Sequence, residues 1–178
     1  LRITPKSVTL TTESAKRAYN GKPLTAPGTV KGFVEGENAE LQVTGTQTAV
    51  GSSKNTYKIV WTETTKADNY QVSETVGTLT VTDQSIEDSK KITVGTLGNV
   101  VYNGKNQKQE PAVTTKDGKT TLVKGTDYTL SYSKDTKNVG EVTVTVTGKG
   151  NYSGTVQRKY QITKAPLTVE TQSDSKVY

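Results

Sequence analysis

The chain has 178 residues, enough for one large or two small domains, and it carries a formal net charge of +6. Hydrophobic residues make up only 30% of it, so its core must be thin, as in a small β-sandwich. It contains no cysteine and no histidine, which excludes disulfides, thiolate and imidazole metal sites and the usual catalytic triads.

The abundant threonine and valine side chains branch at Cβ, which favours strands and predicts almost no helix. In the first part of the chain the sequence Tyr-Asn-Gly-Lys occurs at 19–22. Asn-Gly is a strong hairpin signal, because both central residues of a type I′ turn need positive φ. We therefore predict a hairpin turn at Asn20-Gly21.

Alternating apolar side chains predict strands of a first module, residues 1–83. They are Leu41 and Val43, then Tyr57, Ile59 and Trp61, then Leu79 and Val81. A period of two places Trp61 on the inward face, so core packing is its favoured role. Trp61 is the only tryptophan in the chain, and it is also our one candidate ligand contact, by stacking on a sugar or a partner protein.

The polar segment 84–91 predicts a linker, and residues 92–164 predict a second module. This module repeats Tyr-Asn-Gly-Lys at 102–105 and places Tyr128, Leu130 and Tyr132 on one strand face. Its clearest hairpin alternates valine with threonine through 142–147, turns at 148–151 and continues with Val156, Tyr160 and Ile162. Arg158 interrupts the inward pattern, and we expect its stem to lie along the apolar edge of the core.

Internal repetition links these segments. Residues 3–19 recur without a gap as 162–178, and we interpret residues 165–178 as the start of a third module. Within the two complete modules Val50-Gly51 matches Val139-Gly140, and Asn69-Tyr70 matches Asn151-Tyr152. The first module therefore carries about seven extra residues around Trp61. Each Asn-Tyr pair resembles the tyrosine corner of Ig-like folds, in which the hydroxyl holds a loop backbone.

Five motifs of the second module occur in an order that resembles a repeat widespread in surface proteins of Firmicutes. They are VYNGK at 101–105, KGTDYTLSY at 124–132, NVG at 138–140, VTVTGKGNYSGTV at 144–156 and YQI at 160–162. The first module, with AYNGKPLT at 18–25, is similar to the related MBG or YDG type. The resemblance implies Ig-like or β-grasp-like modules in long arrays of wall-anchored, adhesin-like proteins of Gram-positive bacteria. It supplies no catalytic residue and no ligand.

We therefore expect an all-β chain of two small antiparallel Ig-like sandwiches, with β-grasp-like modules as the alternative. A three-turn helix crossing a sheet would favour that alternative.

Catalytic residues, cofactors and metals are not expected. The carboxylates are scattered, whereas glycosidases need a facing pair, and neither Asp68-Asn69 nor Asp117-Gly118 offers enough oxygens for calcium. Lysines occur singly, which argues against a nucleic-acid partner. No apolar run approaches the roughly 20 residues that span a bilayer.

The expected function is that of a structural spacer, which presents other parts of an extracellular, cell-wall-attached adhesin-like protein at the bacterial surface. We expect a monomer whose partners are neighbouring modules and whose attachment lies outside this segment. The alternative is an adhesive module that binds a host glycoprotein, matrix protein or glycan. An exposed apolar or aromatic patch would favour that alternative.

Overall fold

The computed structural model describes residues 2–133 and 135–177. Within them the only helical segment is a three-residue 3₁₀ turn, η1 (Ala67–Asn69), so the expected all-β class is confirmed. The three-turn helix that would have favoured a β-grasp-like module does not occur in this described part of the chain. The same residues contain no helix long and apolar enough to cross a membrane.

The chain divides into two compact units. The first comprises the residues up to Ser85 together with Gly150–Ser153, and the second comprises Ile86–Lys149 together with the residues from Gly154 onward. The boundary therefore falls inside the polar segment 84–91. In that segment Gln84–Ser85 form a strand, and Ile86 is only 2% exposed. A single buried isoleucine ties the segment to a core, which its polar composition does not reveal.

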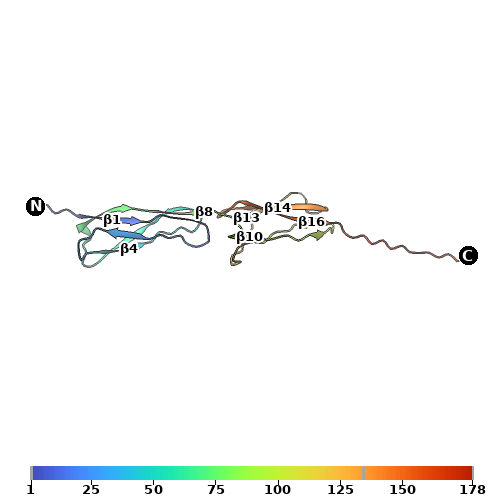
Figure 1. The fold of residues 1–178 in the computed structure, drawn as a ribbon, viewed down its shortest axis with the longest axis horizontal. Helices are drawn as coiled ribbons and strands as arrows, with labels where there is room; N and C mark the ends of the chain where they lie inside the picture. The colour runs from blue at the N-terminus through green and yellow to red at the C-terminus, as the bar shows by residue number, and fades with distance from the viewer. Residues whose placement is uncertain (1, 134, 178) are drawn as a thin grey trace. The chain divides into compact units, whose positions relative to one another are not determined.

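The first unit contains three small groups of paired strands besides one short pair, and Figure 1 labels β1, β8 and β4, one strand of each group. Its strands are β1 (Lys6–Thr12), β2 (Ala15–Ala18), β3 (Gly28–Lys31), β4 (Ala39–Val43), β5 (Gly51–Lys54), β6 (Tyr57–Trp61), β7 (Tyr70–Thr75), β8 (Thr78–Thr82) and β9 (Gln84–Ser85). In the first group β1 lies between β3, which is antiparallel to it, and β7, which is parallel. In the second group β8 lies between the parallel β2 and the antiparallel β5. The third group is the antiparallel pair of β4 and β6.

A further short pair belongs to the first unit, because β9 is parallel to β15 (Tyr152–Ser153). The core of the unit is built from the inward residues of β1 and β8. Val8, Leu10 and Leu79 are fully buried, and Val81 is 2% exposed. Alternation along these strands leaves their threonines pointing outward, apart from the buried Thr12, so few apolar side chains suffice to fill the core.

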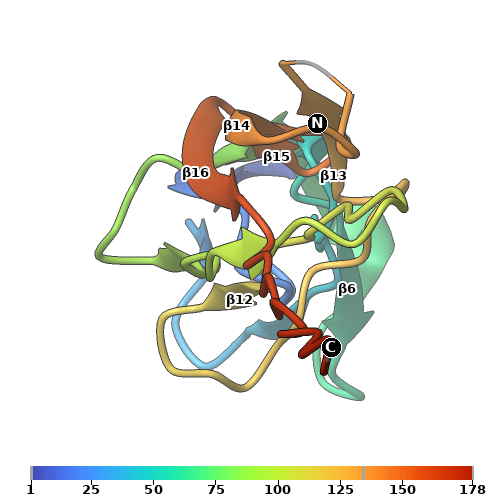
Figure 2. The ribbon, with the colours of Figure 1, turned by 90° about the vertical axis from the view of Figure 1, so that its right-hand side faces the viewer.

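The second unit is organised around a four-stranded sheet. Its strands are β10 (Ile92–Val94), β11 (Val100–Val101), β12 (Val113–Thr115), β13 (Tyr128–Tyr132), β14 (Gly140–Gly148) and β16 (Thr155–Thr163). The sheet order is β11-β16-β14-β13, with β11 parallel to β16, and the two-stranded pair β10-β12 accompanies it. Figure 2 shows β14 and β16 side by side, and their antiparallel register confirms the predicted hairpin.

The two units share several strand pairings, although the pairing of β1 with β7 has no counterpart between β10 and β16. β1 and β3 correspond to β10 and β12, while β2, β8 and β4 correspond to β11, β16 and β13. The correspondence extends to single hydrogen bonds, since the Tyr19 amide donates to the Thr82 carbonyl at 2.8 Å and the Tyr102 amide donates to the Thr163 carbonyl at 2.9 Å. The sequence repeat is therefore matched by a repeat of strand pairing.

A second difference sets the first unit apart, because the continuous β14 is replaced there by two strands, β5 and β6. Asn55 stands between them and is fully buried. Its Nδ2 donates to the carbonyl oxygens of Glu13 at 2.9 Å and Ala26 at 3.0 Å, and its backbone amide donates to Gly77 at 2.8 Å. These bonds turn the chain inward, so β5 pairs with β8 while β6 pairs with β4.

The predicted type I′ hairpin at Asn20-Gly21 is wrong. Gly21 has φ +75°, but no described residue other than glycine has positive φ, and the Asn20 side chain instead accepts from the Lys22 amide at 3.0 Å. The chain cannot return beside itself here, because β2 pairs with β8 and the following β3 pairs with β1. Asn103-Gly104 forms the same turn in the second unit.

Residues 164–177 contain no strand, and their side chains are exposed. Leu167 and Val169, the repeat counterparts of the fully buried Val8 and Leu10, are 87% and 76% exposed.

Candidate functional site around Trp61

Trp61 ends strand β6 and is half-buried in a cluster of three aromatic rings. Its ring stacks on that of Tyr70, with centroids 6.0 Å apart, and meets Phe33 edge-on at 6.1 Å. Phe33 and Tyr70 are themselves 5.0 Å apart in an edge-to-face contact. Offset and edge-to-face pairs at these separations stabilise a core beyond the area they bury. The inward orientation expected for Trp61 is therefore observed, although the ring is not fully covered.

The hydroxyl of Tyr70 fixes the loop that carries Phe33. It donates to the Glu37 carboxylate at 2.7 Å and accepts from the Val34 amide at 3.2 Å. This is the loop-holding role expected for the tyrosine that follows Asn69. Burial first, and the hydrogen bond to Glu37 second, raise the pKa of Tyr70, while the Val34 amide opposes the shift.

A second tyrosine–carboxylate pair lies in the same unit, where the Tyr57 hydroxyl donates to Glu74. The pKa of Tyr57 is raised, mainly because this hydrogen bond favours the protonated phenol, with burial adding to the effect. Both tyrosines thus stay neutral at physiological pH. Neither is prepared to act as a base or a nucleophile.

The aromatic cluster offers a ligand only a few contacts. The indole N–H of Trp61 makes no hydrogen bond with any described residue, and it is not among the fully buried unpaired groups. Val34, next to Phe33, is 42% exposed, and Val60, next to Trp61, is 43% exposed. A half-covered ring with a free N–H could stack on a sugar, but no catalytic pair accompanies it.

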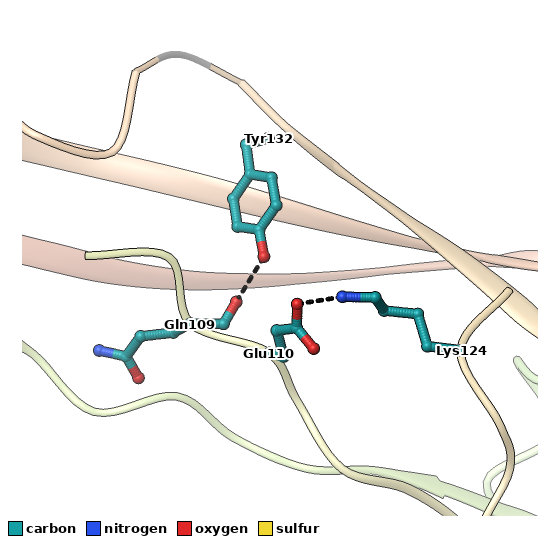
Figure 3. Close-up of polar contacts among 4 residues, drawn as sticks. All are labelled: Gln109, Glu110, Lys124 and Tyr132. Carbon is teal, nitrogen blue, oxygen red and sulfur yellow. Dashed lines mark hydrogen bonds and ion pairs between the residues drawn. The ribbon is translucent and has the colours of Figure 1, made fainter. Parts of the chain in front are cut away.

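A second surface lies in the other unit, where Tyr132 and Tyr160 hold the loop before β12, and Figure 3 shows the contact of Tyr132. The Tyr132 hydroxyl donates to the Gln109 carbonyl at 3.0 Å, and the Tyr160 hydroxyl donates to the Gln107 carbonyl at 2.9 Å. Glu110, on the same loop, forms an ion pair with Lys124. Burial raises the pKa of both Tyr132 and Tyr160. The hydroxyls of Tyr132 and Tyr160 therefore have a structural role.

Several lysines of the second unit are engaged within it. Besides Lys124, Lys159 pairs with Glu141 at 2.8 Å, Lys108 lies 5.6 Å from the centre of the Tyr132 ring, and Lys149 donates to the Gly125 carbonyl at 2.8 Å. Exposed pairs of this kind contribute little to stability. They do, however, reduce the number of lysines that could contact a polyanion freely.

A shallow hollow of about 400 Å³ in the second unit is lined by Ile86, Ile92, Val94, Val156 and Arg158, among others. Arg158 points inward, as its place in the alternation requires, and its guanidinium crosses from β16 to the end of β10. Nη2 donates to the Val94 carbonyl at 2.8 Å, and Nε lies 3.2 Å from the carbonyl oxygens of both Val94 and Gly95. Among the described residues no carboxylate pairs with it. The arginine thus binds backbone carbonyl groups.

Within the described ranges no three acidic side chains come close enough to form a metal site. A scan against protein families finds no match, and no curated protein matches the chain.

Sequence reasoning singled out Trp61, Tyr70 and Arg158 but missed their partners. Glu37 and Phe33 lie in a loop without periodicity, and no sequence signal marks the carbonyls of Val94 and Gly95 as acceptors.

Proposed function

We propose that the chain is a structural segment of an extracellular repeat protein, which spaces or presents other parts of that protein at the surface of a Gram-positive bacterium. The observation that carries this proposal is the set of strand pairings that two consecutive units share, down to the equivalent bonds of Tyr19 and Tyr102. Tandem copies of one unit, each with its own core, are typical of proteins that hold other domains at a distance. The motif resemblance supports the location and the adhesin-like context.

The internal use of polar side chains also supports a structural role. The hydroxyls of Tyr57, Tyr70, Tyr132 and Tyr160 each bond within their own unit. Residues 165–177 fit the same proposal as the first strand of a further module. In that module Leu167 and Val169 would take the buried places that Val8 and Leu10 have in β1.

The competing candidate is an adhesive module that binds a host glycan or protein through Trp61. It is favoured by the free indole N–H and by the exposed Val34 and Val60 beside the aromatic cluster. The evidence against this candidate is that the rings of Trp61, Phe33 and Tyr70 pack against one another.

Glycan and host-protein arrays probed with the labelled chain separate the two. A structural segment gives no saturable binding, whereas an adhesive module gives specific binding that Trp61→Ala abolishes. Val101→Ala is the matched control, because Val101 is 52% exposed in the other unit. Specific binding that survives Trp61→Ala would also contradict a purely structural role. Antibody labelling of intact cells of the source organism tests the surface location.

A further inference from the structure

In both units a strand near the start of the unit lies beside a strand near its end and runs parallel to it. β1 pairs with β7 over six positions from Lys6↔Tyr70 to Thr11↔Thr75, and β2 pairs with β8 over four from Ala15↔Leu79 to Ala18↔Thr82. In the second unit β11 pairs with β16 at two positions. The chain therefore enters each unit at one end of a parallel ladder and leaves it at the other.

This arrangement determines how tension along the chain acts on each unit. A pull on the entering strand draws it backward, and a pull on the leaving strand draws it forward, so the two strands must slide along each other. All hydrogen bonds of the ladder are then loaded together, in shear. A ladder pulled apart from one end would instead lose its bonds one at a time, each a modest net contribution.

We propose that the parallel pairing of an early strand with a late strand in each unit forms a shear clamp that resists tension along the chain. The proposal deepens the structural function above and takes its biological meaning from it, since a surface segment that presents other domains is pulled through its ends. The clamp itself follows from strand order and can be tested alone.

Side chains reinforce the clamp where the backbone ladder is interrupted. In the first unit the Gly77 amide donates to the Thr12 hydroxyl at 3.0 Å, and the Thr78 amide donates to the Ser14 hydroxyl at 2.9 Å. These two bonds bridge the break between the two parts of the ladder. The first unit is thus clamped along the whole length of β7 and β8.

In the second unit the side chain of Arg158 reinforces the clamp. No ladder joins β10 to β16, but the guanidinium of Arg158 on β16 binds the carbonyl oxygens of Val94 and Gly95 at the end of β10. The Gln161 amide adds a bond to the Asn99 side chain at 2.9 Å. Hydrogen bonds from a charged donor are stronger than neutral ones. Arg158 is therefore the central side chain of a shorter clamp.

The clamp is tested by stretching single molecules of the full chain from its ends at constant force. A 20-residue glycine-serine insertion at the exposed turn of Gly118 marks the second unit, because it lengthens the step of that unit by roughly 70 Å. The first unit, with its longer ladder, is expected to unfold at least tenfold more slowly than the second. A first unit that unfolds as fast as the second would contradict the role of the ladder.

The direction of pulling separates a clamp from ordinary stability. The chain has no cysteine, so Lys6→Cys with Asp68→Cys provides two unique handles at the same end of the β1–β7 ladder. Pulled there, the first unit should open at a several-fold lower force than when the chain ends are pulled. Equal forces in the two directions would overturn the proposal, whatever the equilibrium stability of the variant.

Arg158→Gln tests the reinforcement in the second unit. The variant should unfold about tenfold faster or more under end-to-end force, while the step of the first unit stays unchanged. Lys159→Gln is the matched control, since Lys159 is the next residue of β16 and makes only a surface ion pair with Glu141. If Arg158→Gln unfolded under force at the same rate as Lys159→Gln, Arg158 would not be part of the clamp. A ligand found on the arrays would contradict the purely structural function, but it would not change the unfolding forces and rates that test the clamp.

Discussion

Gly45 and Asn55 lie so close together that a Cβ atom on Gly45 would stand 2.5 Å from the Cα of Asn55 and 2.6 Å from its Oδ1. The first atom belongs to the backbone and the second to a buried side-chain amide, so neither can move aside. The contact is where β5 ends and the chain turns into β6.

Gly45→Ala should therefore destabilise the first unit by about 3 kcal/mol, because an added methyl in a closed site forces the backbone apart. Urea titration followed by tryptophan fluorescence measures this directly, since Trp61 reports on the first unit. Gly98→Ala is the control, because nothing lies within 4 Å of a Cβ at Gly98. If Gly45→Ala unfolded at the wild-type urea concentration, the tight approach to Asn55 would not exist in solution.

Asn55→Ala should cost the first unit about 3 kcal/mol as well. It removes the two donors that satisfy the Glu13 and Ala26 carbonyl oxygens, and leaving such groups unpaired costs roughly 1–3 kcal/mol each. Asn20→Ala makes the same change at an exposed turn, where water replaces the lost bond, and should cost less than about 1 kcal/mol. Equal losses for the two variants would argue against Asn55 as the buried support of the β5–β6 break.

These two positions also show where prediction from sequence reached its limit. Strands with a clear alternation, such as those with Val142 and Val146 or with Leu79 and Val81, were predicted because one face of each is buried. Asn55 was not predicted, because asparagine usually marks a turn at the surface and its burial depends on carbonyl groups distant in sequence. For the same reason the parallel pairing of early with late strands, and with it the turn at Asn20, could not be derived from local patterns.

The candidate site was predicted to a similar extent. The period of two correctly placed Trp61 inward, and the tyrosine-corner resemblance correctly suggested that Tyr70 holds a loop. The identity of that loop was hidden, because Phe33 and Glu37 belong to no periodic segment. Whether Trp61 also contacts a ligand stays a prediction for the arrays.

Alkaline pH should destabilise the first unit through Tyr57 and Tyr70. Both have a pKa above the ordinary 10.0, so the folded state holds the phenolic proton more tightly than the unfolded state does. Their contribution is complete below pH 10.0 and is lost as the pH rises through the raised pKa values. Urea midpoints of the first unit should therefore fall as the pH passes this value.

Tyr70→Phe separates this effect from general alkaline damage. The variant should be less stable than wild type at neutral pH, since the bonds to Val34 and Glu37 are lost, but it should lose less stability on the way to alkaline pH. Tyr102→Phe, at a 36% exposed position, should follow the wild-type curve. A Tyr70→Phe curve parallel to wild type would contradict the raised pKa.

In the second unit Tyr160→Phe should release the loop that contains Gln107. Tyr160 is only 2% exposed, so its hydroxyl has few other partners, and the loss should amount to about 1–2 kcal/mol. Hydrogen exchange measured by NMR should show faster exchange of the Gln107 amide, which is bonded to the Thr136 carbonyl at 2.8 Å. Unchanged exchange at Gln107 would show that the loop is held by other contacts.

The packing role of Trp61 can be measured independently of any ligand. Trp61→Ala removes the stacking partner of Tyr70 and the edge contact of Phe33, and it should destabilise the first unit by about 2–3 kcal/mol in thermal unfolding followed by circular dichroism. Trp61→Phe retains an aromatic face and should cost about half as much. In the wild-type chain iodide should quench the indole less than in the urea-unfolded chain, yet measurably, since the ring is half-buried. A stability of Trp61→Ala within about 0.5 kcal/mol of wild type, together with free quenching by iodide, would assign the indole to binding instead of packing.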